Sequence, residues 1–225
     1  MWWVGLVMFA ADYGLIYWAE QFLDSGLTAI LFATLPLITI AFAHVYVPGD
    51  RITMRKLSGT LLAFLGVVAL FGSHVRLDPS KAGPMLAVVA AAACAAAVGV
   101  ASKRHGAALH PAALNTPAMI AGAVALTIAS LLAGEEFMLP RDLATWGAIT
   151  YLAAAGSVLT FLIYFTLLKT WSVTSLSFIS VFTPAIALFL GFIFLDERPT
   201  ALTAAGAALI LTGVTLALTE RTAGR

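Results

Sequence analysis

The amino-acid sequence predicts an all-α integral membrane protein, a bundle of about eight transmembrane helices arranged as an inverted repeat. The composition and an internal repeat support this fold class. Hydrophobic residues make up 61% of the 225-residue chain and charged residues only 10%, whereas soluble proteins average about 45–50% and about 25%. A soluble fold of this size would need more charge on its surface. We therefore expect much of the apolar surface to face lipid.

Long apolar runs set the expected membrane spans. A helix crosses the hydrocarbon with about 20 apolar residues, and it satisfies its own backbone hydrogen bonds, as lipid requires. The runs do not alternate polar and apolar residues in the way that barrel strands do. We expect spans at approximately 2–19, 27–47, 57–72, 84–101, 112–133, 144–168, 173–195 and 201–218.

Polar or helix-breaking segments separate these spans in order. They lie at Glu20 to Gly26, Pro48 to Lys56, Ser73 to Gly83, Lys103 to Pro111, Glu135 to Asp142 and Asp196 to Pro199. The stretch from 143 to 195 is too long for one crossing, so the chain must turn near Lys169. Because every connection is short, we expect one compact transmembrane domain.

The positions of the basic residues predict the orientation. If eight spans place both ends on one side, that side holds Arg51, Arg55, Lys56, Lys103, Arg104, Lys169, Arg221 and Arg225, and the other holds Arg76, Lys81, Arg141 and Arg198. Since cytoplasmic loops are enriched in Lys and Arg, we expect both termini in the cytoplasm and the chain in the cell (inner) membrane.

The charge balance also restricts the partners. Lys and Arg total 12 against 11 for Asp and Glu, and no basic run is long enough to follow a phosphate backbone, so nucleic acid is excluded as an expected partner. His74, His105 and His110 lie in or beside loops without metal-ligand spacing, and His44 is interpreted as an interfacial residue. The lone Cys94 is interpreted as a small packing residue. The lipid bilayer and a small molecule are the expected partners, with no metal.

An internal repeat is the most informative feature of the sequence. Around the second span, Pro36 is followed by Arg51, Thr53, Gly59 and Gly66; around the seventh, Pro184 is followed by Arg198, Thr200, Gly206 and Gly213. The prolines lie 148 positions apart, and the other pairs 147. The two copies would cross the membrane in opposite directions, in halves at 1–73 and 84–219. Many secondary transporters use such inverted repeats to form a substrate site near the membrane midplane.

These duplicated features resemble the drug/metabolite transporter superfamily, specifically its EamA-type exporters. The shared pattern is a proline in a long apolar helix, an acidic-Arg turn such as Asp50-Arg51 or Glu197-Arg198, and a helix with two glycines seven apart. The resemblance covers essentially the whole chain. It implies ten helices in two halves of five, a carrier of small metabolites and no cofactor. Here the first half has three spans and the second has five, so the absent pair corresponds to the family's first two helices.

Asp12 is the strongest functional candidate. It lies near the centre of the first span, about 18 Å along the helix from its cytoplasmic end at 1.5 Å per residue. A carboxylate at this depth should face a cavity, be paired or be protonated, which would suit it to carry a coupling proton or to bind a substrate amine. Alternatively, the span could slide and leave Asp12 near an interface.

Two prolines and a set of polar side chains extend the candidate site. Pro36 and Pro184 free the carbonyls of Phe32 and Ser180, so each marks either a point of helix flexure or a fixed kink. The polar set comprises Tyr13, Tyr17, Thr34, Thr160, Tyr164, Ser177 and Ser180. These residues could line a pocket. Equally, they could be interfacial aromatics and interhelical packing contacts.

The small residues predict close helix packing. Gly59, Gly66, Gly206 and Gly213 would let helix backbones approach one another, and similar surfaces could support a homodimer.

Two functions compete at this point. The first is a secondary transporter that exports a small metabolite by alternating access, with proton coupling as an open alternative. The second is a non-transporting helical subunit or fragment that packs with a partner. The chain has no phosphate-binding loop, zinc-protease spacing, paired aspartates or Gly-x-Ser-x-Gly motif, so we do not expect an enzyme.

Overall fold

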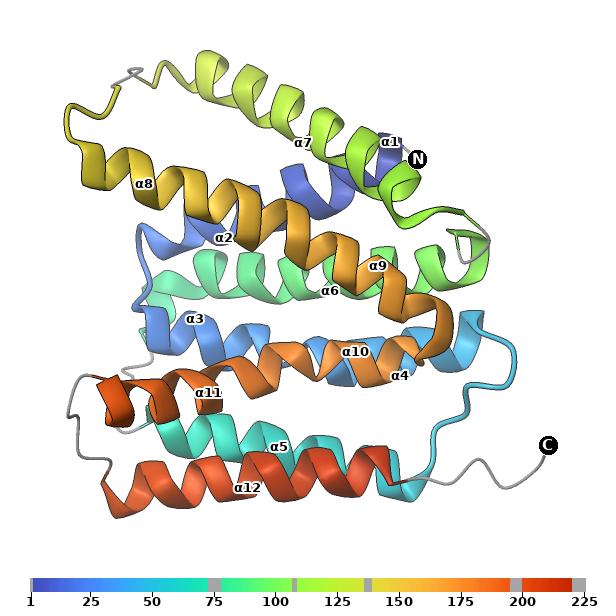
Figure 1. Ribbon diagram of the computed structural model, residues 1–225. Helices are drawn as coiled ribbons and strands as arrows, with labels where there is room; N and C mark the ends of the chain where they lie inside the picture. The colour runs from blue at the N-terminus through green and yellow to red at the C-terminus, as the bar shows by residue number, and fades with distance from the viewer. Residues whose placement is uncertain (1, 73–77, 107–108, 136–138, 195–199, 220–225) are drawn as a thin grey trace.

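The computed structural model describes residues 2–72, 78–106, 109–135, 139–194 and 200–219, and every regular element in these ranges is a helix. The helices lie roughly side by side, and successive helical runs cross the bundle in opposite directions (Figure 1). The first described helix begins and the last ends on the right-hand side of that view. The all-helical bundle predicted from composition is confirmed.

The helical runs follow the predicted spans closely. Up to residue 72 the runs are α1 (Trp2–Gly5), η1 (Leu6–Asp12), α2 (Tyr13–Glu20), α3 (Ser25–Phe32), α4 (Leu35–Tyr46) and α5 (Met54–Phe71). From residue 78 onward they are η3 (Pro79–Lys81), α6 (Ala82–Gly106), α7 (Pro111–Ala133), α8 (Leu143–Tyr151), η4 (Leu152–Leu159), α9 (Thr160–Thr170), α10 (Val173–Ser177), α11 (Ile179–Phe194) and α12 (Ala201–Leu218).

Length and composition qualify seven helices in the described part of the chain as membrane spans. The first predicted span is also helical, continuously from Trp2 to Glu20, but it is not among those seven. This segment contains Asp12 and several Trp and Tyr residues, which lower its mean hydropathy. The acidic-Arg turn at Asp196 to Pro199 lies outside the described residues, as do Arg76, Arg221 and Arg225.

The second and seventh spans are interrupted helices. The second breaks at Ala33 and Thr34, between α3 and α4, and Pro36 lies in the first turn of α4. Proline is tolerated there because the first helical N–H groups have no intrahelical acceptor. The seventh span is interrupted at Phe178, between α10 and α11, which is further before its proline than in the second span. Pro184 therefore lies inside α11. Flexure at either proline stays a prediction.

The glycine pairs meet at a reciprocal contact between α5 and α12, which run antiparallel (Figure 1). A Cβ added to Gly59 would lie 2.6 Å from the carbonyl oxygen of Gly213, and one added to Gly66 would lie 2.6 Å from that of Gly206. Gly59 and Gly206 are repeat equivalents, as are Gly66 and Gly213. The repeat therefore relates the Gly59–Gly213 contact to the Gly206–Gly66 contact. A two-fold axis between the two helices produces this pattern.

The repeat also includes a pair of π-helical segments that the sequence did not reveal. The segment η1 begins at Leu6 and ends at Asp12, while η4 begins at Leu152 and ends at Leu159. The ends are 147 positions apart, the same offset as the glycines. Single-turn π-helical segments interrupt the regular hydrogen bonding of a helix and are frequent at functional sites. The division into halves at 1–73 and 84–219 stays a prediction.

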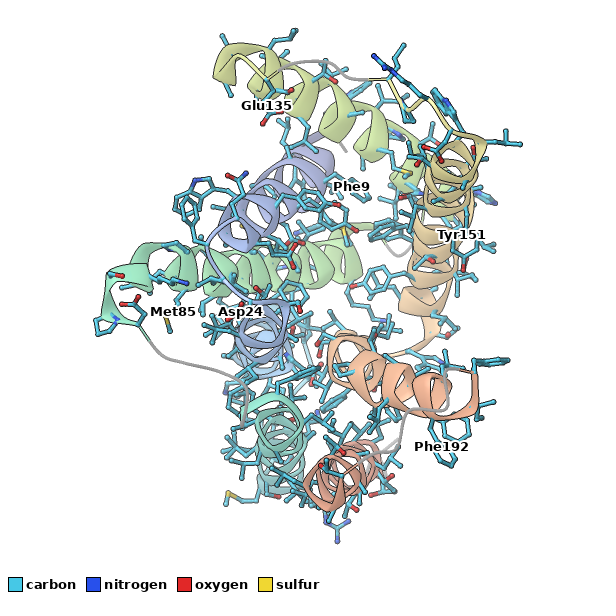
Figure 2. The ribbon with its side chains drawn as sticks, turned by 90° about the vertical axis from the view of Figure 1, so that its left-hand side faces the viewer. Phe9, Asp24, Met85, Glu135, Tyr151 and Phe192 are labelled. Carbon is cyan, nitrogen blue, oxygen red and sulfur yellow. The ribbon has the colours of Figure 1, made fainter. Side chains whose placement is uncertain are left out.

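The first and sixth spans differ in how well they are covered. In the first span, η1 packs against α6 and α7. In the sixth, both α8 and η4 are fully described and none of their residues is buried. Figure 2 shows this span, with Tyr151, at one margin of the bundle, apart from α6 with Met85. The two repeat-equivalent spans are therefore packed differently: the first is covered by neighbouring helices, and α8 and η4 of the sixth are largely exposed.

Candidate functional site

A cavity of about 420 Å³ lies inside the helical bundle. It is lined by residues from η1, α2, α3, α4, α6, α9, α10 and α11, so both interrupted spans and both spans with π-helical segments contribute. Most of the lining is apolar, and hydroxyl groups and one carboxylate provide the polar contacts. This size and composition are typical of small-molecule sites.

Asp12 is the one formally charged residue among those that line the cavity, all of which the structure describes. It is the last residue of η1, and only 3% of its surface is exposed. Its Oδ1 has no hydrogen-bond partner among the described residues. A buried carboxylate oxygen without a partner is costly. A cation, a donor group of a ligand or a proton would each remove that cost.

The residues that follow the two π-helical segments both reach the cavity. Tyr13 follows η1 and Thr160 follows η4, and both line the cavity. The Thr160 hydroxyl donates to the Ala155 carbonyl at 2.8 Å, which leaves its oxygen lone pairs available as acceptors. Tyr164, one turn further along α9, lines the same wall.

The break in the seventh span brings two serines to the cavity. Ser177 ends α10 and donates to the Thr174 carbonyl at 2.7 Å, and Ser180, near the start of α11, donates to the Ser177 carbonyl at 3.0 Å. Both hydroxyl protons are thus used within the chain. The serine oxygens can still accept hydrogen bonds from a ligand.

Six of the eight predicted pocket residues line the cavity: Asp12, Tyr13, Thr160, Tyr164, Ser177 and Ser180. Tyr17 and Thr34 do not. Tyr17 is 62% exposed, and although its ring lies beside that of Tyr13, the cavity does not extend to it. Thr34 donates to the Leu31 carbonyl at 2.7 Å within the helix break.

Several lining residues were absent from the predicted site. Phe32 and Leu35 flank the break in the second span. They lie 148 positions before Ser180 and Thr183, which also line the cavity. The proline offset could therefore have identified both. Gly99 of α6 also lines the cavity, but glycine in an Ala-rich helix gives no sequence signal that distinguishes a pocket wall from packing.

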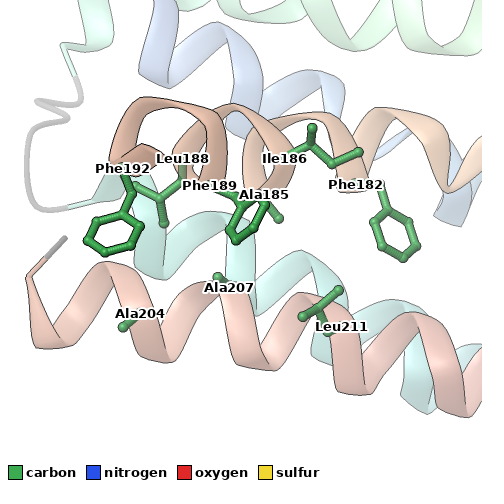
Figure 3. Close-up of a pocket in the computed structure, with 9 residues that line it drawn as sticks. All are labelled: Phe182, Ala185, Ile186, Leu188, Phe189, Phe192, Ala204, Ala207 and Leu211. Atoms are coloured by element: carbon green, nitrogen blue, oxygen red, sulfur yellow. The ribbon is translucent and has the colours of Figure 1, made fainter. Parts of the chain in front are cut away.

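A second hollow of about 350 Å³ lies between α11 and α12 (Figure 3). Its lining consists only of Phe, Ala, Ile and Leu side chains, among them Phe189 and Leu211. It has no side-chain donor or acceptor to orient a polar ligand. In the described ranges, no cluster of three or more His, Cys, Asp or Glu side chains could hold a metal ion.

Comparison with known proteins identifies the fold and the family. The model of the EamA-like transporter family matches residues 2–72 and 83–219. The chain belongs to the EamA-like transporter family. A crystal structure described only as that of a protein superposes with a TM-score of 0.85 at 20% identity, covering 96% of this chain and 75% of the other. That likeness shows the EamA-like chain to have a fold already observed in a crystal.

The chain is similar to several proteins that are named as transporters or exporters. The uncharacterized transporter YoaV of Bacillus subtilis is 27% identical over 94% of this chain and 72% of its own length. A probable terminal-alkyne amino-acid exporter of Streptantibioticus cattleyicolor is 29% identical over 94% and 69%. A probable amino-acid metabolite efflux pump of Escherichia coli is 28% identical over 93% and 73%. These names indicate a membrane transporter rather than an enzyme.

Proposed function

We propose that this chain is a secondary transporter that exports a small amphipathic molecule by alternating access, with the cavity around Asp12 as its substrate site. The observation that carries the proposal is a buried, unpartnered carboxylate in a mostly apolar cavity between two interrupted helices. Broken helices at the membrane midplane are where inverted-repeat transporters bind substrates and ions. The interior site can then face each side in turn.

The lining chemistry favours a substrate with an apolar body and a cationic amine. The single charge of the lining is negative, so an ammonium group is attracted to Asp12, and the carboxylate of a zwitterionic amino acid would have to lie away from it. The Ser177, Ser180 and Thr160 oxygens can accept further hydrogen bonds from the amine. The names of two relatives, which refer to amino acids, support testing neutral amino acids first.

Asp12 would also serve as the coupling group. When the substrate amine leaves, the buried carboxylate needs either a proton or another cation. Exchange of an outward-moving amine for an inward-moving proton would keep the site neutral in both directions. Proton coupling follows from this exchange.

The experiment measures amino-acid flux in proteoliposomes that contain the purified chain, with and without an imposed proton gradient. Asp12→Asn should reduce gradient-driven flux by roughly ten- to a hundredfold, because a charged hydrogen bond contributes about 1.5–3 kcal/mol. Asp24→Asn is the matched control, since Asp24 is exposed and its side chain does not cap α3. Undiminished gradient-driven flux in Asp12→Asn would remove Asp12 from the mechanism.

A second candidate function is that of a subunit completed by other membrane helices. The uncovered apolar surface of α8 and η4 favours it, because their repeat equivalents in the first span are covered by α6 and α7. A pair of helices packed as α6 and α7 are would cover that surface. Flux carried by the purified chain alone would contradict this function. Flux that appears only when a helical partner is added would support it.

A further inference from the structure

We propose that a pocket at the basic end of the bundle binds a phosphate-bearing anion, with the guanidinium groups of Arg51 and Arg104 as its ligands. The pocket has a volume of about 270 Å³ and is separate from the central cavity. Residues 44–51, which end α4 and begin the connection to α5, form most of its wall. Arg104 in the last turn of α6 completes it.

Both arginines are available to a ligand. The side chains of Arg51 and Arg104 are exposed, and neither guanidinium group forms a hydrogen bond or ion pair with any residue in the described part of the chain. A guanidinium presents five N–H donors in a planar arrangement that matches phosphate oxygens in pairs. Two guanidinium groups at one small pocket can together bind an anion that has several acceptor oxygens, such as a phosphate.

The acidic residue of the pocket does not cancel this charge, because it is already paired. Asp50 Oδ1 accepts a hydrogen bond from Lys56 Nζ at 2.8 Å. Asp50 Oδ2 lies 3.5 Å from the Thr174 hydroxyl that donates to it. The Asp50–Lys56 pair is neutral as a unit, so the net charge presented by the pocket comes from the two arginines.

The turn geometry places a further donor at the pocket. Gly49 has a φ of +84°, which most side chains would disfavour and which lets the chain reverse directly after α4. Across this turn, Nδ1 of His44 in the last turn of α4 accepts a hydrogen bond from the Ile52 amide at 3.4 Å. In a neutral imidazole, Nε2 then carries the proton and can donate to an anion.

The position at the end of the spans favours a phospholipid headgroup as the source of the phosphate. The pocket lies where α4 ends at Tyr46 and α6 ends at Gly106, at one boundary of the apolar segments. Basic pockets between helices at the cytoplasmic membrane surface bind anionic headgroups. Nearby Lys103 is otherwise engaged, since its Nζ donates to the carbonyls of Leu168 and Trp171 at 2.6 and 2.9 Å.

The test compares binding of phosphatidylglycerol and of inorganic phosphate to the purified chain. Nanodiscs of phosphatidylcholine would contain increasing phosphatidylglycerol, and bound lipid would be measured by native mass spectrometry. Arg51→Gln with Arg104→Gln should weaken retention of phosphatidylglycerol by about tenfold or more. Arg51→Lys should weaken retention of phosphatidylglycerol less, because the positive charge remains. Some weakening is still expected, because lysine lacks the paired N–H donors of arginine.

Arg55→Gln is the matched control, because Arg55 is a nearby exposed arginine of α5 that does not line the pocket. It should retain wild-type binding. Competition between inorganic phosphate and phosphatidylglycerol would support the site, and retention of inorganic phosphate alone would identify a free anion as the source. Equal loss in Arg55→Gln and the double variant would show general surface charge and overturn the proposal. So would a wild type that retains neither probe.

Discussion

At the residue scale, the width of the central cavity depends on one glycine. A Cβ added to Gly99 would lie 2.9 Å from the Tyr164 hydroxyl oxygen and 3.1 Å from Val173 Cγ2. All three residues line the cavity. The absence of a side chain at position 99 therefore lets the Tyr164 hydroxyl approach α6 closely.

We predict that Gly99→Ala narrows the cavity and destabilises the fold by about 1–3 kcal/mol, the usual cost of overpacking. Tyr164→Phe in the same chain should restore most of that stability, since it removes the atom that the new methyl group meets. Thermal unfolding in detergent measures both changes. Gly83→Ala, on the same helix with nothing within 4 Å of the added Cβ, is the control. No rescue by Tyr164→Phe would contradict this geometry.

At the element scale, α5 and α12 pack closely against each other because glycines lie on both contacting faces. At each of the four glycines the nearest atom that an added Cβ would meet is a backbone atom, such as the Gly206 carbonyl oxygen at 2.6 Å from a Cβ at Gly66. Backbone cannot rotate away as a side-chain end can. The same face is buried within the chain, so a homodimer would have to use another surface. Dimerisation stays a prediction.

We expect Gly66→Ala and Gly213→Ala to force the two helices apart and to lower the stability by at least about 1–3 kcal/mol. In contrast, Gly147→Ala should stabilise α8 by up to about 1 kcal/mol, because nothing lies within 4 Å of the added Cβ and alanine is the better helix former. Chemical or thermal unfolding in mild detergent would compare the three. Equal effects at positions 66 and 147 would argue against the close approach.

At the scale of the whole molecule, successive helical runs cross the bundle in opposite directions, as spans that cross a membrane require (Figure 1). The turn at Gln21 to Asp24 lies at one end, and the turn at Val47 to Thr53 lies at the other. The second turn is on the side richer in Lys and Arg. By the positive-inside rule, that side should be cytoplasmic.

Cysteine labelling in intact cells tests this orientation. In a Cys94→Ala background, Asp24→Cys should react with a membrane-impermeant maleimide added outside, and Pro48→Cys should react only after the membrane is permeabilised. Asp24 and Pro48 are both exposed, so a difference in labelling reports the side of the membrane rather than burial. The reverse pattern would invert the predicted topology.

The sequence alone determined the class, the spans and the repeat. Hydrophobic run length is set by bilayer thickness, and duplicated Pro36 and Pro184 are visible without coordinates. It also indicated Asp12, because a charge within an apolar span is conspicuous. The interruptions at Ala33–Thr34 and Phe178, the π-helical segments and the role of Gly99 depended on the tertiary structure. These features depend on which helix faces pack together. The sequence of a helix that is apolar on every side does not show which face contacts a neighbouring helix. For the same reason, only the structure separated Tyr13 at the cavity from Tyr17 on the surface.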